Sequence, residues 1–217
     1  MIPTNMSLGG WLRAGASLAI AVAATLPLAV AGGVGTSFCH GDSGGAGFAD
    51  FFGCQPCPCT NEAPAGARGG CLNSGNRSAV LSAEGSASVS TGDLRFVVES
   101  ANRGVFVILS SADNRLPAQG LISPCTGMGM SSAFSDGLRC IGGNVLRHGV
   151  RVADDLGEVG DTTPGWGGVD APGSLAMANG FAPGRTRQFQ ATYREEVTFG
   201  CGTGRNTTNA VSVVFVP

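Results

Sequence analysis

Five of the eight cysteines lie between Cys39 and Cys71, in the stretch CHGDSGGAGFADFFGCQPCPCTNEAPAGARGGC. This stretch has almost no apolar periodicity, so it cannot fold by burying hydrophobic surface alone. A segment of this kind needs covalent or metal cross-links. The stretch therefore decides how the first part of the protein is held together, but it does not indicate which reaction, if any, the protein catalyses.

The four cysteines Cys54, Cys57, Cys59 and Cys71 give the spacing C-x2-C-x-C-x11-C, which leaves three explanations open. The first gap suits zinc, but the C-x-C continuation does not. A redox pair at Cys54 and Cys57 would need a strand-to-helix context, which a Gly/Pro-rich loop does not offer. The third explanation, a disulfide framework, is the default in an exported chain.

We expect all eight cysteines to form disulfides, although eight cysteines allow 105 connectivities. Cys57 and Cys59 are too close to pair with each other, so we expect them to have different partners. We further predict a bridge between Cys140 and Cys201, and an additional pair formed by Cys54 and Cys125. The complete set is Cys39, Cys54, Cys57, Cys59, Cys71, Cys125, Cys140 and Cys201.

Residues 1–31 have the pattern of a signal peptide. Arg13 supplies the positive charge, an apolar stretch follows, and Ala29-Val30-Ala31 fits an A-x-A cleavage site. An uncleaved anchor is the alternative, because Ala14–Val34 is uncharged and nearly long enough to span a membrane. We expect a secreted or cell-surface protein that has no membrane contact once the leader is cleaved.

The charge pattern argues against a nucleic-acid partner. All 13 basic residues are Arg, they are scattered singly, and the net charge is −2. No run of basic residues provides the electrostatic footprint that nucleic acid or an anionic membrane requires.

Residues 39–45, CHGDSGG, are similar to the signature around the trypsin-family nucleophile. In that fold the base and its orienting carboxylate precede the serine, whereas here nearly everything before Ser43 is leader. We therefore predict that Ser43 is not a nucleophile and that the segment is a Gly-rich turn capped by Asp42.

Beyond Cys71 the pattern predicts short antiparallel strands separated by turns. In residues 94–99, for example, Leu94, Phe96 and Val98 alternate with Arg95 and Glu99. Residues 153–183 are irregular and read as one long loop. The predicted strands cover residues 79–83, 87–90, 94–99, 105–110, 138–141, 144–152, 187–197 and 210–216.

These elements predict an all-β protein, with a single antiparallel β-sandwich or jelly-roll-like domain at residues 79–217. Residues 32–78 would form a disulfide-rich N-terminal arm on that domain. We also expect residues 136–140 to lie beside the strand at residues 187–194, with Leu138 and Cys140 facing inward together.

Weak candidates for ligand binding lie in two acidic, Gly-rich loops. Oxygen ligands on irregular backbone suit Ca²⁺, and the candidates are Asp42, Asp154, Asp155 and Asp161. Trp166, with Gly on both sides, could stack on a sugar, although a Trp that closes the edge of a sandwich is commoner. We expect no other cofactor.

Motifs along the whole mature chain give it a resemblance to a family of uncharacterised exported proteins of planctomycetes and myxobacteria. The motifs are Phe38-Cys39, Gly41-Asp42, Cys57-Pro58-Cys59-Thr60-Asn61, Gly70-Cys71-Leu72-Asn73-Ser74, Phe134, Asp136-Gly137-Leu138-Arg139-Cys140, Arg147-His148-Gly149, Gly184-Arg185-Thr186-Arg187, Phe189-Gln190, Tyr193-Arg194 and Asn206-Thr207-Thr208-Asn209-Ala210. The resemblance implies export and a compact Cys-rich domain, and it implies no activity.

We therefore expect a non-catalytic extracellular module with a structural role or with an extracellular protein or glycan as its partner. The alternative is a secreted hydrolase of unknown substrate. A cleft that brings His148, Glu195 or Glu196 close to a second titratable group would favour the hydrolase.

Overall fold

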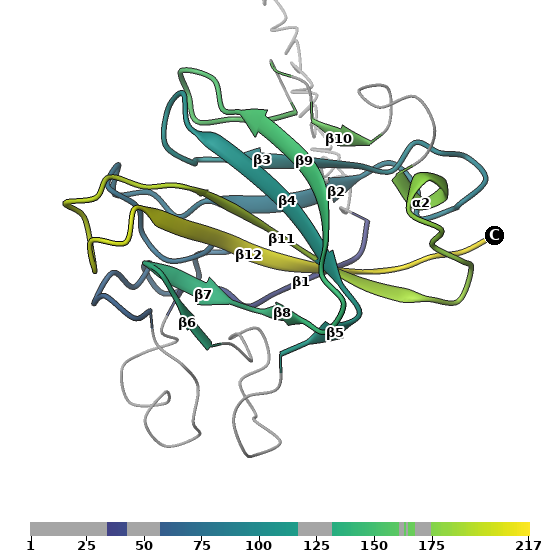
Figure 1. The fold of residues 1–217 in the computed structure, drawn as a ribbon, viewed down its shortest axis with the longest axis horizontal. Helices are drawn as coiled ribbons and strands as arrows, with labels where there is room; N and C mark the ends of the chain where they lie inside the picture. Colours follow the sequence, from purple (N-terminus) through teal and green to yellow (C-terminus); the bar gives the residue numbers. More distant parts are fainter. Residues whose placement is uncertain (1–33, 43–56, 117–131, 161–162, 164, 168–174) are drawn as a thin grey trace, which may run out of the picture. The chain divides into compact units, whose positions relative to one another are not determined.

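The protein is an all-β domain, seen here in a computed structural model (Figure 1). The structure describes residues 34–42, 57–116, 132–160, 163, 165–167 and 175–217. The chain divides into two units, Met1–Gly32 and Gly33–Pro217, and the first lies outside the described residues. Within the described part, no helix has the length and apolar character needed to cross a bilayer.

The main sheet has five antiparallel strands in the order β1-β12-β11-β4-β9. The strands at the centre of this sheet are long, because each carries alternating apolar residues and pairs with a strand on both sides. The bounds are β1 Thr36–Phe38, β4 Phe106–Ala112, β9 Leu146–Val152, β11 Thr186–Arg194 and β12 Arg205–Val214. Because β1 pairs with β12, the predicted N-terminal arm contributes an edge strand to the sheet of the domain.

A second sheet, in the order β10-β3-β2, packs against one face of the main sheet and completes the sandwich. Its strands are β2 Val80–Glu84, β3 Arg95–Glu99 and β10 Trp166–Gly167. Phe96 from the second sheet and Phe189 from the main sheet meet in the core, with ring centroids 4.3 Å apart. The predicted inward positions Leu94, Phe96 and Val98 are all buried.

A smaller layer covers part of the other face of the main sheet. It consists of two short hairpin-like pairs, β5-β8 and β6-β7. Their bounds are β5 Asn114–Arg115, β6 Ser132–Phe134, β7 Gly137–Arg139 and β8 Ile141–Gly142. Its buried core includes Leu138, Ile141 and Cys140 together with Phe38 and Ala210. The middle of the main sheet is therefore buried on both faces, which explains why the polar side chains of β11 are also buried.

Residues 136–140 lie beside β11, as predicted, but they pair with β6 rather than joining the main sheet. The Gln190 side chain makes the connection. Its Nε2 donates to the Leu138 carbonyl at 2.7 Å, and its Oε1 accepts the Cys140 N–H at 3.0 Å. Leu138 and Cys140 are both buried, while Arg139 between them is exposed, so the predicted alternation is confirmed.

The loop predicted at residues 153–183 contains two short elements that the sequence did not reveal. They are β10 and α2, a single helical turn at Leu175–Ala178. By contrast, residues 87–90 form no strand and contribute only an isolated bridge between Ser88 and Val216. A two-residue strand and one helical turn are too short to leave a periodic pattern.

Candidate functional site

Six cysteines of the described residues form three disulfides: Cys39–Cys140, Cys57–Cys71 and Cys59–Cys201. The Cα–Cα distances are 6.1, 5.8 and 5.3 Å, all within the range that a disulfide spans. Cys57 and Cys59 have different partners, as expected. Cys54 and Cys125 lie outside the described residues, so the predicted pair between them stays a prediction.

The predicted bridge between Cys140 and Cys201 is wrong. Cys140 is buried and is bonded to Cys39, just after edge strand β1, while Cys201 is exposed and is bonded to Cys59. The prediction failed because it placed Cys201 from sequence distance to β11 alone. The turn at residues 199–204 carries Cys201 toward the arm instead, where its N–H donates to Asp136 Oδ1 at 2.9 Å.

These bonds also exclude two of the alternatives for the cysteine stretch. Cys57, Cys59 and Cys71 are oxidised, so they cannot serve as the thiolate ligands of a zinc site. Cys57 is bonded to Cys71, which also excludes a redox pair between Cys54 and Cys57.

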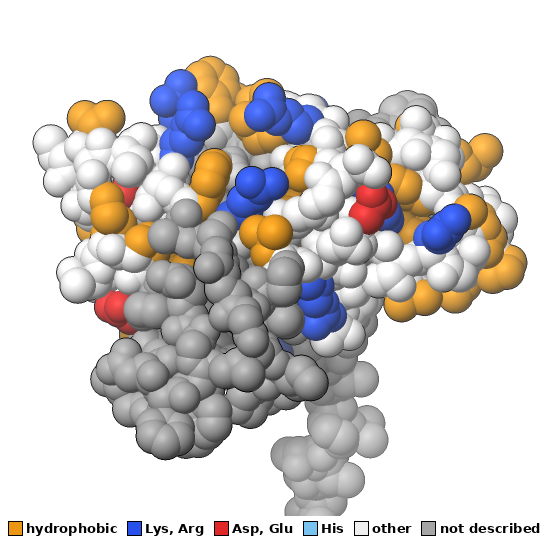
Figure 2. Space-filling view, turned by 60° about the horizontal axis from the view of Figure 1, so that its bottom comes forward, with side chains coloured by type: hydrophobic (Ala, Val, Ile, Leu, Met, Phe, Trp, Pro, Cys, Tyr) orange, Lys and Arg blue, Asp and Glu red, His pale blue; other side chains and the backbone are white. Residues whose placement is uncertain are grey.

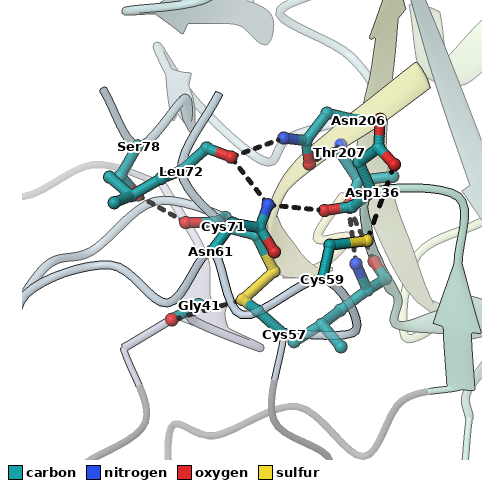
Figure 3. The surroundings of a disulfide bond; sticks show 12 residues. Gly41, Cys57, Cys59, Asn61, Cys71, Leu72, Ser78, Asp136, Asn206 and Thr207 are labelled. Atoms are coloured by element: carbon teal, nitrogen blue, oxygen red, sulfur yellow. Dashed lines mark hydrogen bonds between the residues drawn. A yellow bond between two sulfur atoms is a disulfide. The ribbon is translucent and has the colours of Figure 1, made fainter. Parts of the chain in front are cut away.

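A buried polar network surrounds the disulfides and accounts for several motif residues (Figure 3). The Asn61 amide donates to the Leu72 and Asp136 carbonyls at 2.7 and 2.8 Å, and Asn206 donates to the same Leu72 carbonyl at 2.9 Å. Leu138 N–H donates to Thr207 Oγ1 at 3.0 Å. Asn206-Thr207-Thr208 has the N-x-[ST] pattern of a glycosylation site, but Asn206 is fully buried, so it is a structural residue of the folded protein rather than an accessible acceptor.

Two of the Ca²⁺ candidates, Asp42 and Asp154, act as turn caps. Asp42 Oδ2 accepts the Gly66 N–H at 2.8 Å, and Asp154 Oδ1 accepts the N–H groups of Leu156 and Glu158. Asp155 is exposed, and Asp161 lies outside the described residues. Within the described ranges, the one set of three possible ligand groups within 4.8 Å is Cys59, Asp136 and Cys201, two of which are bonded to each other.

The sugar-stacking hypothesis for Trp166 is wrong. Its side chain is only 1% exposed, and its Nε1 donates to the Gly149 carbonyl at 3.2 Å. Trp166 pairs with Phe96 across the second sheet, so it closes the edge of the sandwich. A ring without an accessible face offers nothing for a sugar to stack on.

Two serine–histidine contacts bear on the hydrolase alternative. His148 Nε2 lies 2.8 Å from Ser111 Oγ, but Ser111 is fully buried. Burial lowers the pKa of His148 to about 4, and the Arg187 guanidinium contributes to the same shift. His148 thus lies beside a cation rather than the orienting carboxylate that a nucleophile's base requires.

The other contact joins exposed Ser37 to His40, with Oγ and Nε2 2.9 Å apart. Burial lowers the pKa of His40, and the Asp42 carboxylate opposes that shift. Asp42 makes its hydrogen bond with Gly66, however, and none joins it to the imidazole. Ser43, which carried the protease signature, lies outside the described residues.

Glu195 and Glu196 border a polar hollow of about 560 Å³, together with Arg77, Arg103 and Asn102. Glu195 is almost fully buried. Its Oε1 accepts hydrogen bonds from Asn102 Nδ2 at 2.6 Å and from the Glu196 N–H at 3.0 Å. These bonds tie the carboxylate into the fold at the end of β11, which is a structural role.

Four arginines line a groove on the outer face of the main sheet that sequence reasoning missed. We call it the arginine groove; its volume is about 440 Å³. Four Arg residues and five apolar residues line it, and no acidic residue among the described ones does. They are Arg139, Arg147, Arg194, Arg205, Phe106, Ile108, Phe134, Ile141 and Val145, with Ser110, Gln190, Thr192, Tyr193 and Thr207 between them.

The register of the main sheet places two of these arginines side by side and a third on a neighbouring part of the same sheet. Arg194, the last residue of β11, lies directly opposite Arg205, the first residue of β12. Arg147 on β9 pairs with Ser110 on β4, which in turn pairs with Gln190 on β11. Figure 2 shows one face of the molecule, on which several separate Arg side chains lie among hydrophobic and uncharged ones and few acidic side chains are visible.

The groove arginines lack acidic partners within the described part of the chain. The two ion pairs there are Arg95–Glu84 and Arg187–Asp113, and neither is in the groove. Of the four groove arginines, and counting only bonds between described residues, Arg139 alone makes a side-chain hydrogen bond, from Nε to the Ile141 carbonyl at 3.1 Å. Four arginines that are separated in the sequence thus lie in one groove, which the spacing of residues along the chain could not have shown.

Comparisons of the chain with protein-family models, with curated proteins and with solved structures gave no match.

Proposed function

We propose that this chain is an exported, disulfide-cross-linked binding module that holds an anionic glycan in the arginine groove. The observation that carries the proposal is the opposition of Arg194 and Arg205 across neighbouring strands. Like charges directly opposite each other destabilise a sheet by about 0.2–1 kcal/mol. A protein with only 13 basic residues accepts that cost here, without a compensating acid among the residues that the structure describes, and an anionic ligand would remove it.

The mixed lining of the groove favours an acidic sugar chain. Guanidinium groups form paired hydrogen bonds with carboxylate or sulfate groups. Phe106, 58% exposed, and the half-buried Phe134 supply apolar surface beside them, which suits the less polar face of a sugar ring. An acidic peptide presents the same carboxylate groups and is therefore a necessary comparison.

Three lines of reasoning support an extracellular setting. The disulfides suit an oxidising compartment. The leader pattern of residues 1–31 and the resemblance to exported Cys-rich proteins agree with that setting. The module would act after removal of the leader, as a secreted or surface-attached protein.

The test is isothermal titration of the mature protein with polygalacturonate, dextran sulfate, uncharged dextran and poly-glutamate. We expect binding to the acidic glycans, weakening with salt, and none to dextran. The Arg194→Gln/Arg205→Gln variant should lose at least about tenfold in affinity, because two charge-assisted contacts contribute about 1.5 kcal/mol or more.

Arg68→Gln/Arg185→Gln is the matched control, since it removes the same number of charges and both arginines are exposed and lie outside the groove. Equal losses in both variants would mean that overall charge, not the groove, attracts polyanions. Tighter binding of poly-glutamate than of either glycan would mean that the ligand of the groove is an acidic peptide rather than a glycan. No binding to any polyanion would overturn the proposal.

A further inference from the structure

The disulfide Cys59–Cys201 differs from the other two in its exposure. Cys201 is exposed and Cys59 is half-buried, whereas the four cysteines of the other two bonds are at most 4% exposed. A dissolved thiol can therefore approach Cys201 while the protein stays folded. Accessibility of this kind normally makes a disulfide the first to be reduced.

A buried carboxylate lies against this bond. Asp136 is fully buried, and its Oδ1 lies 3.5 Å from Cys59 Sγ while accepting the Cys201 N–H at 2.9 Å (Figure 3). A disulfide sulfur carries no proton, so the 3.5 Å approach is a non-bonded contact. The Ser135 carbonyl oxygen lies 3.7 Å from the same sulfur. Cys59 Sγ thus faces two oxygens and no described cation.

The packing around Asp136 fixes this arrangement. A Cβ on Gly200 would lie 3.2 Å from Asp136 Cγ and 3.3 Å from Cys59 Cβ, so the turn presses closely on both groups. Asp136 Oδ2 has no hydrogen-bond partner and is sealed from solvent. The carboxylate can neither turn away from the sulfur nor be screened by water.

We infer that Cys201 Sγ is the point of attack for external thiols and that Asp136 keeps that attack slow. In the first step, a reductant thiolate forms a bond to Cys201 Sγ, the Cys59–Cys201 bond breaks, and Cys59 leaves as a thiolate that takes a proton from solvent. A second reductant thiol then displaces Cys201 and completes a two-electron reduction in which the reductant becomes a disulfide.

The leaving group decides the rate of the first step. A thiol of lower pKa leaves faster, and a nearby carboxylate raises the pKa of a thiol by disfavouring its anion. Cys59, facing Asp136 Oδ1 and the Ser135 carbonyl, is therefore a poor leaving group. This protects the bond that ties the N-terminal arm to the turn after β11, independently of what the arginine groove binds.

The experiment measures dithiothreitol reduction of each bond by time-resolved alkylation and peptide mass spectrometry. In Asp136→Asn we expect reduction of Cys59–Cys201 to be about tenfold faster, because removal of a like charge beside the Cys59 thiolate makes Cys59 a better leaving group. Cys39–Cys140 and Cys57–Cys71 should keep their rates. Glu196→Gln removes one nearby exposed charge and should change none of the three.

An unchanged rate in Asp136→Asn would overturn the inference. Equal acceleration of all three bonds would do the same, because it would show that Asp136 only stabilises the fold. If the variant does not fold, the wild type still decides: its exposed Cys59–Cys201 bond should be reduced at least about tenfold more slowly than oxidised glutathione at the same pH. A rate equal to that of glutathione would refute the protection.

Discussion

The side-chain amide of Asn209 forms a two-way hydrogen-bonded pair with the backbone of Leu81. Asn209 Oδ1 accepts the Leu81 N–H at 2.7 Å, and Nδ2 donates to the Leu81 carbonyl at 3.0 Å. Asn209 lies on β12 of the main sheet and Leu81 on β2 of the second sheet. The Asn209 side chain therefore makes the two backbone hydrogen bonds to Leu81 that a neighbouring strand would otherwise make. It also joins the two sheets at a fully buried position.

Asn209→Asp should destabilise the protein by about 2–3 kcal/mol, because it places a carboxylate oxygen opposite the Leu81 carbonyl and leaves both buried acceptors without a donor. Urea unfolding at neutral pH gives the free energy. The exposed Asn76→Asp is the matched control and should change stability by less than about 0.5 kcal/mol. Similar losses of stability in the two variants would contradict the conclusion that Asn209 joins the two sheets.

The loss of stability on removal of a disulfide should increase with the length of chain that the disulfide closes. Cys39–Cys140 spans 101 residues and Cys57–Cys71 spans 14. The chain-entropy relation gives about 4.7 and about 3 kcal/mol for loops of these lengths. We therefore expect Cys39→Ala/Cys140→Ala to lower the melting temperature more than Cys57→Ala/Cys71→Ala does. Calorimetry checks the order, and the reverse order would show that native packing outweighs loop entropy.

Acidification should destabilise the protein through His148. Its pKa is about 4 in the folded state and about 6.5 when unfolded. The unfolded chain therefore binds the proton first, so stability present above pH 6.5 is lost as the pH falls toward 4. With a discount for partial exposure of the ring, the loss is about 1–3 kcal/mol.

The measurement is urea unfolding at pH 7 and pH 4.5. In His148→Gln, the free energy of unfolding should differ less between the two pH values. A smaller pH dependence should remain from His40, whose pKa is also lowered. An unaltered pH dependence in His148→Gln would contradict the assignment.

Ser43 should not react with a fluorophosphonate probe, because His40, the only histidine before it, lies three residues away on the same loop, and side chains so close on one loop rarely meet in triad geometry. Intact-mass analysis after incubation with the probe is the check. Labelling lost in Ser43→Ala would revive the protease reading. Labelling lost in Ser37→Ala would instead assign reactivity to the pair formed with His40.

The class of the fold could be read from the sequence because strand patterning is local. Alternation at Leu94, Phe96 and Val98 predicted a strand, and all three side chains are buried; in the strand predicted at residues 187–197, Phe189, Ala191 and Tyr193 are buried too, although β11 is covered on both faces. The shared inward face of Leu138 and Cys140 was predictable for the same reason. The short elements β10 and α2 were not, since neither is long enough to show a period.

The β-rich character of the chain and the suitability of its cysteines for disulfides could be predicted from the sequence, because residue alternation and cysteine content can be read along the chain. The bond of Cys201 to Cys59 rather than Cys140, and the meeting of Arg139, Arg147, Arg194 and Arg205 in one groove, became visible in the folded structure. Those outcomes depend on strand register and on the direction of a Gly-rich turn. Both are set by how distant segments pack, which no local pattern contains.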